Sequence, residues 1–356
     1  MKRLAPLLMS LPPLLALAAP AEEFTPFAVT FENDVFVNSD DNYTDGVQIA
    51  WARRKLADGP LEKRLLASIC RQFGCDARQE ATITHKIGQL MYTPTDISNP
   101  APQPEDHPWA GMLYYQRNYD LAVSEKESIT ISGLAGIIGP HALAKQAQKF
   151  IHRHITDSPD PQGWHNQIGN ALGLMATLEQ RKSIGYLLGD PERWSLNSAW
   201  YWRAAAGNVT TSAAIGLSFR YGYRQPALVL GDNSGISTKS GPMIENRAAR
   251  PVAPGSACLG LDWLDCSVTA NIELRAVAYN VFLDGRWGHD DPHVDSKVLV
   301  ADTSLGLRLA LPRHKLGRFG TPFIMLQITQ RSSEYRSARP PGAQAWGAIT
   351  VGADFP

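Results

Sequence analysis

The stretch that decides the fold is residues 215–223, Ile-Gly-Leu-Ser-Phe-Arg-Tyr-Gly-Tyr, where large apolar side chains alternate with small or polar ones. A period of two residues is that of a β-strand, in which successive side chains point to opposite faces of the sheet. The same alternation recurs along nearly the whole chain, for example at Phe27–Phe31, Val47–Trp51 and Leu305–Leu309. The pattern therefore predicts an all-β protein of about twelve strands.

The N-terminus has a different pattern, that of a secretory signal peptide. Two basic residues precede an apolar run over residues 4–17, and small residues then offer cleavage sites before Glu22. This layout is typical of exported proteins. The sequence predicts a signal peptide over residues 1–21 and a single mature domain over residues 22–356.

Charge and hydropathy exclude two classes of protein. The 34 Lys and Arg residues balance 34 Asp and Glu residues in this chain of 356 residues. Zero net charge supplies no cationic field for phosphates, so no nucleic-acid partner is expected. Beyond the N-terminus no run of about 18 apolar residues occurs, which excludes a helical membrane protein. A membrane β-barrel stays compatible with the composition, because polar residues facing the lumen dilute the average hydropathy.

The alternation has two physical interpretations. In a soluble sandwich the apolar face packs a core, whereas in a membrane barrel it meets lipid and the polar face lines the lumen. The signal peptide and the charged polar-side residues Glu273, Arg275 and Arg308 favour an antiparallel transmembrane barrel of about twelve strands in a Gram-negative outer membrane. Large aromatic residues share the apolar parity and are expected to form interfacial girdles; they are Trp194, Trp200, Trp202, Tyr221 and Tyr223.

The four cysteines agree with export. They form two pairs that are close in sequence, Cys70 with Cys75 and Cys258 with Cys266. Of the three connectivities that four cysteines allow, local pairing closes two small loops and is the economical one. A zinc site would need two-residue spacings and histidine partners, which these stretches lack. Structural disulfides in an oxidising compartment are therefore expected.

One segment, about residues 139–160, breaks the strand rhythm and predicts a short helical insertion in an outer loop. It begins at Gly139-Pro140, and proline suits the first turn of a helix. With helical periodicity, its polar side chains form one stripe and its apolar side chains lie opposite. That polar stripe either faces solvent or lines a site. It contains His141, Lys145, Gln148 and His152, opposite Leu143, Ala147, Phe150 and Ile151.

Two other stretches carry potential metal ligands. Residues 32–34 end the first strand and residues 39–46 open the second, which gathers at one hairpin end the oxygen ligands that Ca²⁺ prefers. Without a β-bulge, Asp34 and Thr44 both take the lumen parity of their strands. An ordinary polar turn is the alternative interpretation. The segment His289–Asp295 is rich in histidine and carboxylate, which fits a transition-metal site or a solvated loop.

Several short elements occur in a fixed order along the mature chain. They are Glu32-Asn33-Asp34, Tyr43-Thr44-Asp45-Gly46, Gly88–Pro94, His107–Gly111, Gly139-Pro140 with Gln148 and His152, Gly163-Trp164 with Gln167, and Asn280–Gly285. No single element is decisive, but the ordered set resembles the outer-membrane lipid A 3′-O-deacylases. The fourth element departs from that family, which has an arginine and a tyrosine where this chain has His107 and Trp109.

The resemblance implies a twelve-stranded outer-membrane barrel whose active site lies between the barrel wall and a helix. It implies hydrolysis of the ester that holds the 3′-acyloxyacyl group of lipid A. Lipopolysaccharide is then the substrate, outer-membrane lipid the surrounding partner, and Ca²⁺ the cofactor. We expect a monomer.

The resemblance also implies a role for each matching residue. His152 matches the family's histidine, which would act as the general base on water. Asn33 and Asp34 match an asparagine–aspartate pair that would lie beside the calcium ion. Thr44 and Gln148 match residues that would orient the imidazole or the water. The family also has an acidic calcium ligand after the histidine. In this chain Asp157, Ser158 and Asp160 lie near that position, and we assign Asp157 to it.

Two other functions remain as alternatives. A non-catalytic barrel, such as a small pore or a structural envelope protein, would show the same alternation, although a narrow lumen filled by side chains disfavours a general porin. A soluble periplasmic metal hydrolase would use the segment His289–Asp295. The sequence contains no G-x-S-x-G elbow, P-loop or H-E-x-x-H motif, so those hydrolase and NTPase templates are absent.

Overall fold

The computed structural model describes residues 27–34, 42–56, 59–156, 159–223, 258, 260–261, 263–311, 321–337 and 342–354. The predicted signal peptide, residues 1–21, lies outside these ranges.

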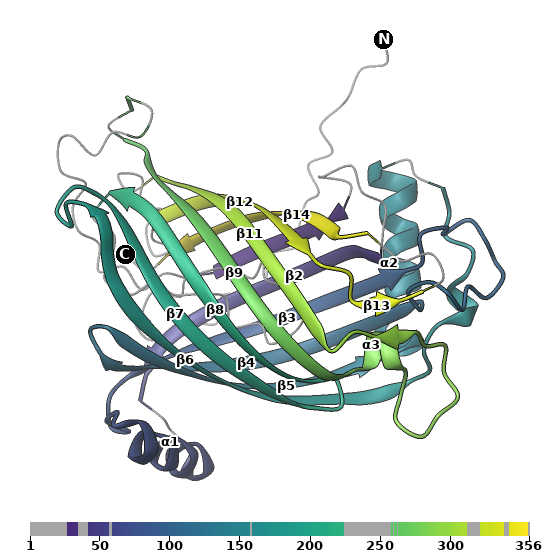
Figure 1. Cartoon of the computed structure of the whole chain (residues 1–356), viewed down its shortest axis with the longest axis horizontal. Coiled ribbons are helices and arrows are strands. Elements are labelled where there is room, and N and C mark those ends of the chain that lie inside the picture. The colour runs from purple at the N-terminus through teal and green to yellow at the C-terminus, as the bar shows by residue number, and fades with distance from the viewer. Residues whose placement is uncertain are drawn as a thin grey trace, which may run out of the picture.

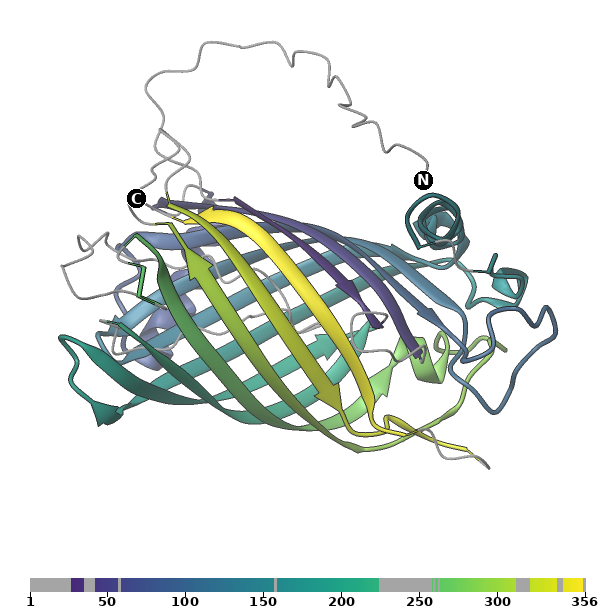
Figure 2. The ribbon, with the colours of Figure 1, turned by 90° about the horizontal axis from the view of Figure 1, so that it is seen from above.

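Twelve strands close into a single antiparallel barrel, as the alternation predicts (Figures 1 and 2). Strand β1 pairs with β2 on one side and with β14 on the other, which completes the ring. The barrel strands are β1 (Phe27–Asn33), β2 (Asn42–Lys55), β3 (Ala81–Thr93), β4 (Ala110–Ser124), β5 (Glu127–Ile138), β6 (Ala171–Gly189), β7 (Trp194–Gly207), β8 (Thr210–Tyr223), β9 (Asp265–Asn280), β11 (Leu299–Ala310), β12 (Thr321–Arg331) and β14 (Gln344–Asp354). A separate two-stranded sheet joins β10 (Asp295–Ser296) to β13 (Tyr335–Arg336).

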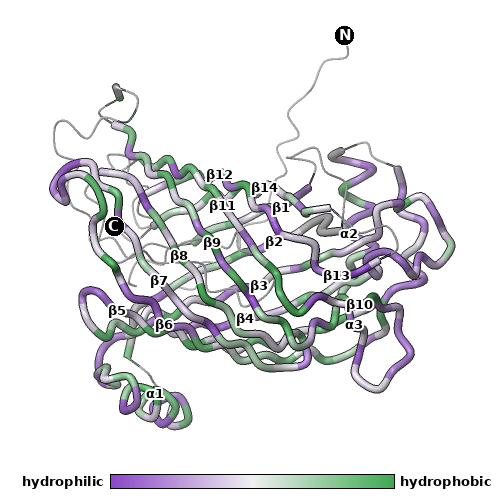
Figure 3. The backbone as a smooth tube through the Cα atoms, viewed as in Figure 1, coloured by the Kyte–Doolittle hydropathy of each residue, from purple (hydrophilic) through white to green (hydrophobic). Residues whose placement is uncertain are grey.

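Hydrophobic and hydrophilic residues alternate along the barrel strands (Figure 3), and the exposed fractions of the side chains assign the apolar ones to the outer face and the polar ones to the lumen, as the predicted parity requires. In β8, Ile215 is 62% exposed on the outer face, whereas Arg220 on the inner face is 2% exposed. Aromatic residues of the apolar parity face outward too, since Trp200 and Tyr221 are 39% and 46% exposed. The expected aromatic positions on the outer surface are therefore confirmed.

Buried ion pairs line the inner face of the barrel wall. Arg203 on β7 binds Glu273 on β9 at 2.8 Å, past the intervening strand β8, and Tyr201 donates a hydrogen bond to the same carboxylate at 2.7 Å. On the adjacent strands β12 and β11, Arg331 binds Asp302 at 2.7 Å. A lumen occupied by paired, hydrogen-bonded charges suits a filled barrel better than an open pore.

Two helices lie outside the ring, at opposite ends of the barrel (Figure 1). Helix α2 (Ala144–Ile151) confirms the predicted insertion; a 3₁₀ turn precedes it over Pro140–Ala142 and a π-helical turn follows over His152–Thr156. Helix α1 (Pro60–Phe73) is not part of the sequence-based prediction. A one-turn helix, α3 (Val281–Asp284), follows β9. None of the helices in the described ranges is long and apolar enough to cross a membrane.

Both disulfides join neighbouring cysteines, Cys70 to Cys75 and Cys258 to Cys266, as local pairing predicts. The alternation predicts one of the twelve strands near Trp164–Arg181, and the structure differs at the start of this segment. Trp164–Asn166 forms a 3₁₀ turn, and β6 begins only at Ala171.

Candidate active site

Helix α2 packs against the outer wall of the barrel. Its residues Ala144 and Ile151 form a buried cluster with Met91 of β3 and with two tryptophans, Trp109 and Trp164. Met91 belongs to the outward parity of β3, yet it is fully buried, whereas Ile87 of the same parity is 45% exposed. The helix therefore covers the end of β3 at Met91, while the outward-facing residue Ile87, earlier along the same strand, is exposed on the barrel surface.

A glycine allows this close packing. Gly111 lies on β4 beneath the start of α2, and a Cβ atom at this position would lie 2.4 Å from the Cβ atom of Ala144. Real Cβ atoms do not approach so closely, so any larger residue would push the helix away from the wall.

The buried face of α2 differs from the face that its amphipathic pattern predicts. Gln148 and His152 are buried with 0% and 8% exposure, whereas Leu143 and Phe150 are 51% and 58% exposed. Within the predicted polar stripe, Gln148 and His152 are thus the buried members, whereas His141 and Lys145 are exposed. That the buried part lines a site stays a prediction. The pattern misleads because amphipathic analysis assumes water around the helix, while this helix lies on an apolar barrel wall.

Gln148 is held by an indole. Its side-chain oxygen accepts a hydrogen bond from Trp164 Nε1 at 2.6 Å. Trp164 in turn packs against Trp109, with ring centroids 5.0 Å apart. With its oxygen occupied, Gln148 keeps its amide nitrogen, Nε2, which is buried and has no hydrogen-bond partner in the described part of the chain. A buried donor without a protein partner marks a place where a ligand or water is expected.

His152 ends α2 and begins the π-helical turn, and such turns are frequent at functional sites. Its Nδ1 atom lies 2.7 Å from the carbonyl oxygen of Pro159. A carbonyl oxygen can only accept a hydrogen bond, so Nδ1 carries the hydrogen and donates the hydrogen bond to the Pro159 carbonyl oxygen. The neutral ring therefore has its lone pair on Nε2, the nitrogen that a general base needs.

Asn33 and Asp34 lie at the end of β1. Asn33 has outward parity, but it is only 5% exposed, and Asp34 is 1% exposed. The β1 register places Asn33 opposite Asp45 of β2. A buried carboxylate requires compensation by hydrogen bonds or by a cation.

The prediction for Thr44 needs a correction. Its lumen parity assumes that β2 has no bulge, but the pairing of β2 with β3 shifts register between Tyr43 and Asp45, so Thr44 is an extra residue in β2. A bulge interrupts the alternation, and simple counting then no longer assigns a face. The side chain of Thr44 lies outside the described part of the structure, as does the whole of Asp157.

The end of β1 and helix α2 occupy the same end of the barrel, as both views show (Figures 1 and 2). Phe31 of β1 packs against the same cluster that contains Ile151, the neighbour of His152. Asn33 and Asp34 follow Phe31 directly along the chain. The fold thus gathers Asn33, Asp34, Gln148 and His152 at one end of the molecule.

Asp160, one of the three residues near the expected calcium ligand, has a different partner. Its carboxylate accepts a hydrogen bond from Arg153 Nε at 3.0 Å and a second one from Nη2 of the same guanidinium. The Arg153 hydrogen bond holds the pKa of Asp160 below its usual value. This bidentate pairing makes Asp160 a structural residue of the turn after α2.

The geometry of the loop His289–Asp295 favours a structural loop over a metal site. Burial alone would raise the pKa of Asp291, but hydrogen bonds from Arg286 lower it, the closest of them from Nε at 2.7 Å. His289, Asp290 and His293 are exposed. Within the ranges that the structure describes, no three His, Cys, Asp or Glu side chains gather as metal ligands. The loop interpretation of this segment is the better one.

Comparison with known proteins identifies the family. The family model described as outer membrane protein LpxR matches residues 4–355. The chain belongs to the LpxR family. Members of the family are lipid A 3′-O-deacylases of the Gram-negative outer membrane, and therefore ester hydrolases.

A solved structure of this family has the same fold. LpxR from Salmonella typhimurium has a TM-score of 0.67 at 16% identity, over 93% of this chain and 100% of that one. The β domain of the Bordetella autotransporter BrkA has a TM-score of 0.41 at 9% identity, over 94% of this chain and 100% of that one. No curated protein matches the sequence.

Two elements of the LpxR resemblance have structural roles at this end of the barrel. His107, which replaces an arginine of the family, is buried and stacks on Tyr92 with ring centroids 5.0 Å apart. Burial lowers its pKa. Phe282 of α3 stacks on the other side of the cluster, 4.7 Å from the Tyr92 ring. The fourth and last elements of the resemblance therefore both contact Tyr92 in one aromatic cluster.

Proposed function

We propose that this chain hydrolyses the 3′-O-ester of lipid A with His152 as the general base. The observation that carries the proposal is the hydrogen bond from His152 Nδ1 to the carbonyl oxygen of Pro159. It fixes the neutral tautomer in which Nε2 can accept a proton.

The reaction follows the usual course of ester hydrolysis. Nε2 of His152 takes a proton from water as the water oxygen attacks the ester carbonyl carbon. When the tetrahedral intermediate collapses, the bond to the 3′ oxygen breaks and the imidazolium returns its proton to that oxygen. The products are an acyloxyacyl carboxylic acid and a free 3′ hydroxyl group. His152 ends the cycle neutral.

Gln148 is suited to stabilise the negative charge that develops on the carbonyl oxygen. Trp164 holds its amide oxygen and leaves the buried Nε2 donor for the substrate. A fixed donor aimed at a developing oxyanion is among the strongest catalytic contributions. Thr44 is proposed to orient the water or the imidazole, as the family resemblance implies.

The donor chemistry at the end of β1 fits calcium in kind. A buried amide oxygen on Asn33 and a buried carboxylate on Asp34 are hard oxygen ligands, and Ca²⁺ takes six to eight such oxygens in total. We propose that Asn33, Asp34 and Asp157 hold the ion, together with other oxygen atoms. When bound, calcium supplies Lewis-acid stabilisation of the developing negative charge.

The position of α2 suits a membrane lipid as substrate. Exposed apolar residues surround the helix: Leu143 at its N-terminal cap, Phe150 on α2, and Ile87 and Leu113 on the adjacent wall. Acyl chains can stay in the apolar layer while the sugar and its ester reach the buried face of α2. We propose that a single chain suffices, because all proposed groups belong to one barrel end.

Mass analysis of lipid A from cells that express the chain tests the proposal. The wild-type chain should remove one acyloxyacyl unit, and His152→Ala should leave lipid A unmodified. His154→Ala is the matched control, because His154 is exposed, lies two residues away and only contacts Phe150, with tilted rings whose centroids are 4.8 Å apart. Full deacylation by His152→Ala would remove the proposed base. Unmodified lipid A with wild-type protein, accompanied by altered solute permeability, would favour the non-catalytic barrel.

A further inference from the structure

Helix α1 connects β2 to β3 and packs on the outer wall at the barrel end opposite α2 (Figure 1). Its residues Leu66 and Cys70 are buried against Ala81 and Ile83 of β3 and Leu121 of β4. Ile83 has the same outward parity as Ile87, which is 45% exposed. The helix therefore covers wall positions that elsewhere face the surroundings of the barrel.

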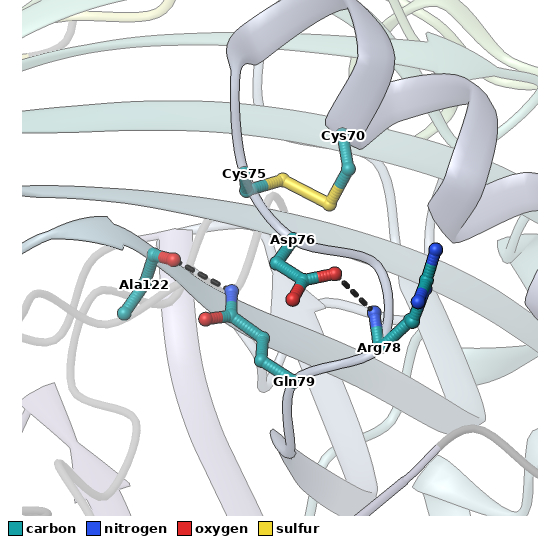
Figure 4. Close-up of a disulfide and its surroundings, with 6 residues drawn as sticks. All are labelled: Cys70, Cys75, Asp76, Arg78, Gln79 and Ala122. Atoms are coloured by element: carbon teal, nitrogen blue, oxygen red, sulfur yellow. Dashed lines mark hydrogen bonds between the residues drawn. A yellow bond between two sulfur atoms is a disulfide. The ribbon is translucent and has the colours of Figure 1, made fainter.

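Several contacts hold α1 in this place. Glu62 accepts an ion-paired hydrogen bond from Arg117 of β4 at 2.7 Å. At the other end, the disulfide between Cys70 and Cys75 ties the last helical turn to the segment that leads into β3 (Figure 4). Gln79 in that segment donates a hydrogen bond to the Ala122 carbonyl oxygen at 2.6 Å. Because both ends are tied to the wall, the orientation of the helix is fixed.

The rest of the helix surface has two chemical faces. Leu61 and Leu65 form an exposed apolar stripe at spacing i, i+4, with 80% and 46% exposure. Lys63, Arg64 and Arg71 are exposed basic residues. The only acidic residue of α1 is Glu62, whose charge Arg117 already compensates. The exposed surface of α1 is thus apolar and cationic together.

The wall beside α1 continues this pattern. The next residue of β3 on the same outer face as Ile83 is His85. Its ring stacks on Trp51 with ring centroids 5.3 Å apart, and its Nδ1 atom forms a hydrogen bond with the Tyr115 hydroxyl group at 2.6 Å. Tyr115 is 39% exposed on the outer face. Aromatic rings with one polar atom collect where the apolar layer of a membrane meets its headgroups. Helix α1 lies on the barrel-end side of this aromatic group.

We propose that α1 is an interfacial helix that binds anionic phospholipid in the leaflet at its end of the barrel. Leu61 and Leu65 enter the boundary of the acyl layer, and Lys63, Arg64 and Arg71 contact headgroup phosphates. An apolar stripe beside a basic one is the pattern of helices that lie in this plane. Opposite charge selects anionic headgroups, since each basic residue near such a surface contributes to binding. The proposal is independent of the deacylase reaction.

A site-specific fluorophore tests the depth of the helix. All four cysteines are in disulfides, so a single cysteine introduced as Leu61→Cys takes one environment-sensitive label. Glu125→Cys is the matched control, because Glu125 is exposed in the β4–β5 turn at the same barrel end. In vesicles of phosphatidylcholine and phosphatidylglycerol, brominated lipid should quench the label at 61 and aqueous iodide the label at 125. Equal iodide quenching at both positions would overturn the proposal. This would hold even if α1 were found to bind a soluble protein instead.

A charge variant tests the choice of lipid. With the label at position 61, brominated phosphatidylglycerol should quench more strongly than brominated phosphatidylcholine at equal content. The variant Lys63→Gln, Arg64→Gln, Arg71→Gln should abolish this preference while Leu61 stays in the membrane. An unchanged preference would show that these residues do not bind the headgroups and would contradict the proposal. Heat-modifiable migration in electrophoresis verifies that each variant forms the barrel.

Discussion

His152 Nδ1 lies 2.7 Å from the Pro159 carbonyl oxygen, and the next residue on each side of this contact, Arg153 and Asp160, forms an ion pair. The ion pair therefore braces the hydrogen bond that orients the imidazole. The Arg153 side chain is 58% exposed and the Asp160 side chain 29% exposed, so solvent screening limits how strongly this ion pair acts. Its role is to position the base rather than to contact substrate.

Asp160→Asn should lower deacylation about two- to fivefold, because it weakens an exposed ion pair without removing the base. The charge-swapped double variant Arg153→Asp, Asp160→Arg should recover most of this loss. The measurement is the initial rate in mixed micelles, with folded barrel quantified on the same gel. A double variant slower than Asp160→Asn would contradict the brace.

The pH dependence of this brace has a defined sign. The folded-state pKa of Asp160 lies below its ordinary value, so the brace is complete above that ordinary value and weakens only as pH falls through the lowered one. The ratio of wild-type to Asp160→Asn rates should therefore be constant from neutral to mildly acidic pH. A ratio that changes near neutrality would show that another group controls the effect.

Trp164→Phe should keep the packing against Trp109 but remove the donor to Gln148. A buried acceptor that loses its partner costs about 1–3 kcal/mol, so stability falls modestly and the Gln148 side chain turns. We expect kcat to fall about tenfold or more, with a smaller change in KM, because an oxyanion donor acts in the transition state. Trp287→Phe, at a position 75% exposed, is the control. An equal loss in both variants would count against a role for Gln148.

Gly111→Val should displace α2 from the wall, since even a Cβ atom at Gly111 meets Ala144. Deacylation should be lost while the barrel still shows heat-modifiable migration, because the strand itself accepts valine. Gly133→Ala in β5 is a matched control, because a Cβ atom there meets nothing within 4 Å. Normal activity in Gly111→Val would show that the position of α2 is not critical.

Chelation of calcium should stop deacylation, and added Ca²⁺ should restore it better than Mg²⁺. Mg²⁺ demands a small octahedral shell and gives up its water reluctantly, whereas Ca²⁺ accepts irregular sets of protein oxygens. Asn33→Ala should raise the calcium concentration needed for half-maximal activity. Full activity after exhaustive chelation would eliminate the metal from the proposal, while leaving the role of His152 open to its own test.

The sequence predicts the barrel well and the site only in part. Alternation identifies all twelve strands, because each face of a membrane barrel meets one kind of environment. It cannot predict the bulge at Thr44, where one extra residue interrupts the pattern without any special composition. The sequence includes Trp164 among the elements of the family resemblance but does not predict that it holds Gln148, because an aromatic residue before a strand looks like part of that strand.

Helix α1 could have been predicted from its boundaries. Pro60 occupies the first turn, and Gly74 ends the helix in the left-handed conformation with φ of 80°. The buried face of α2 could not have been predicted from periodicity. A helix that lies between a barrel wall and an apolar phase has no fully aqueous side, so its apolar residues need not point toward protein.

The two outer helices rest on the same pair of strands, α1 over Ile83 and α2 over Met91. These residues are eight positions apart on β3, which corresponds to roughly 26 Å along the strand. Strand tilt shortens this span to a height near that of the apolar band of an outer-membrane barrel. If α1 binds lipid headgroups as proposed, movement of the barrel along the membrane normal would draw its basic side chains into hydrocarbon. The proposed site beside α2, at the other end of the same strands, would then be held at a constant depth relative to the surrounding lipids.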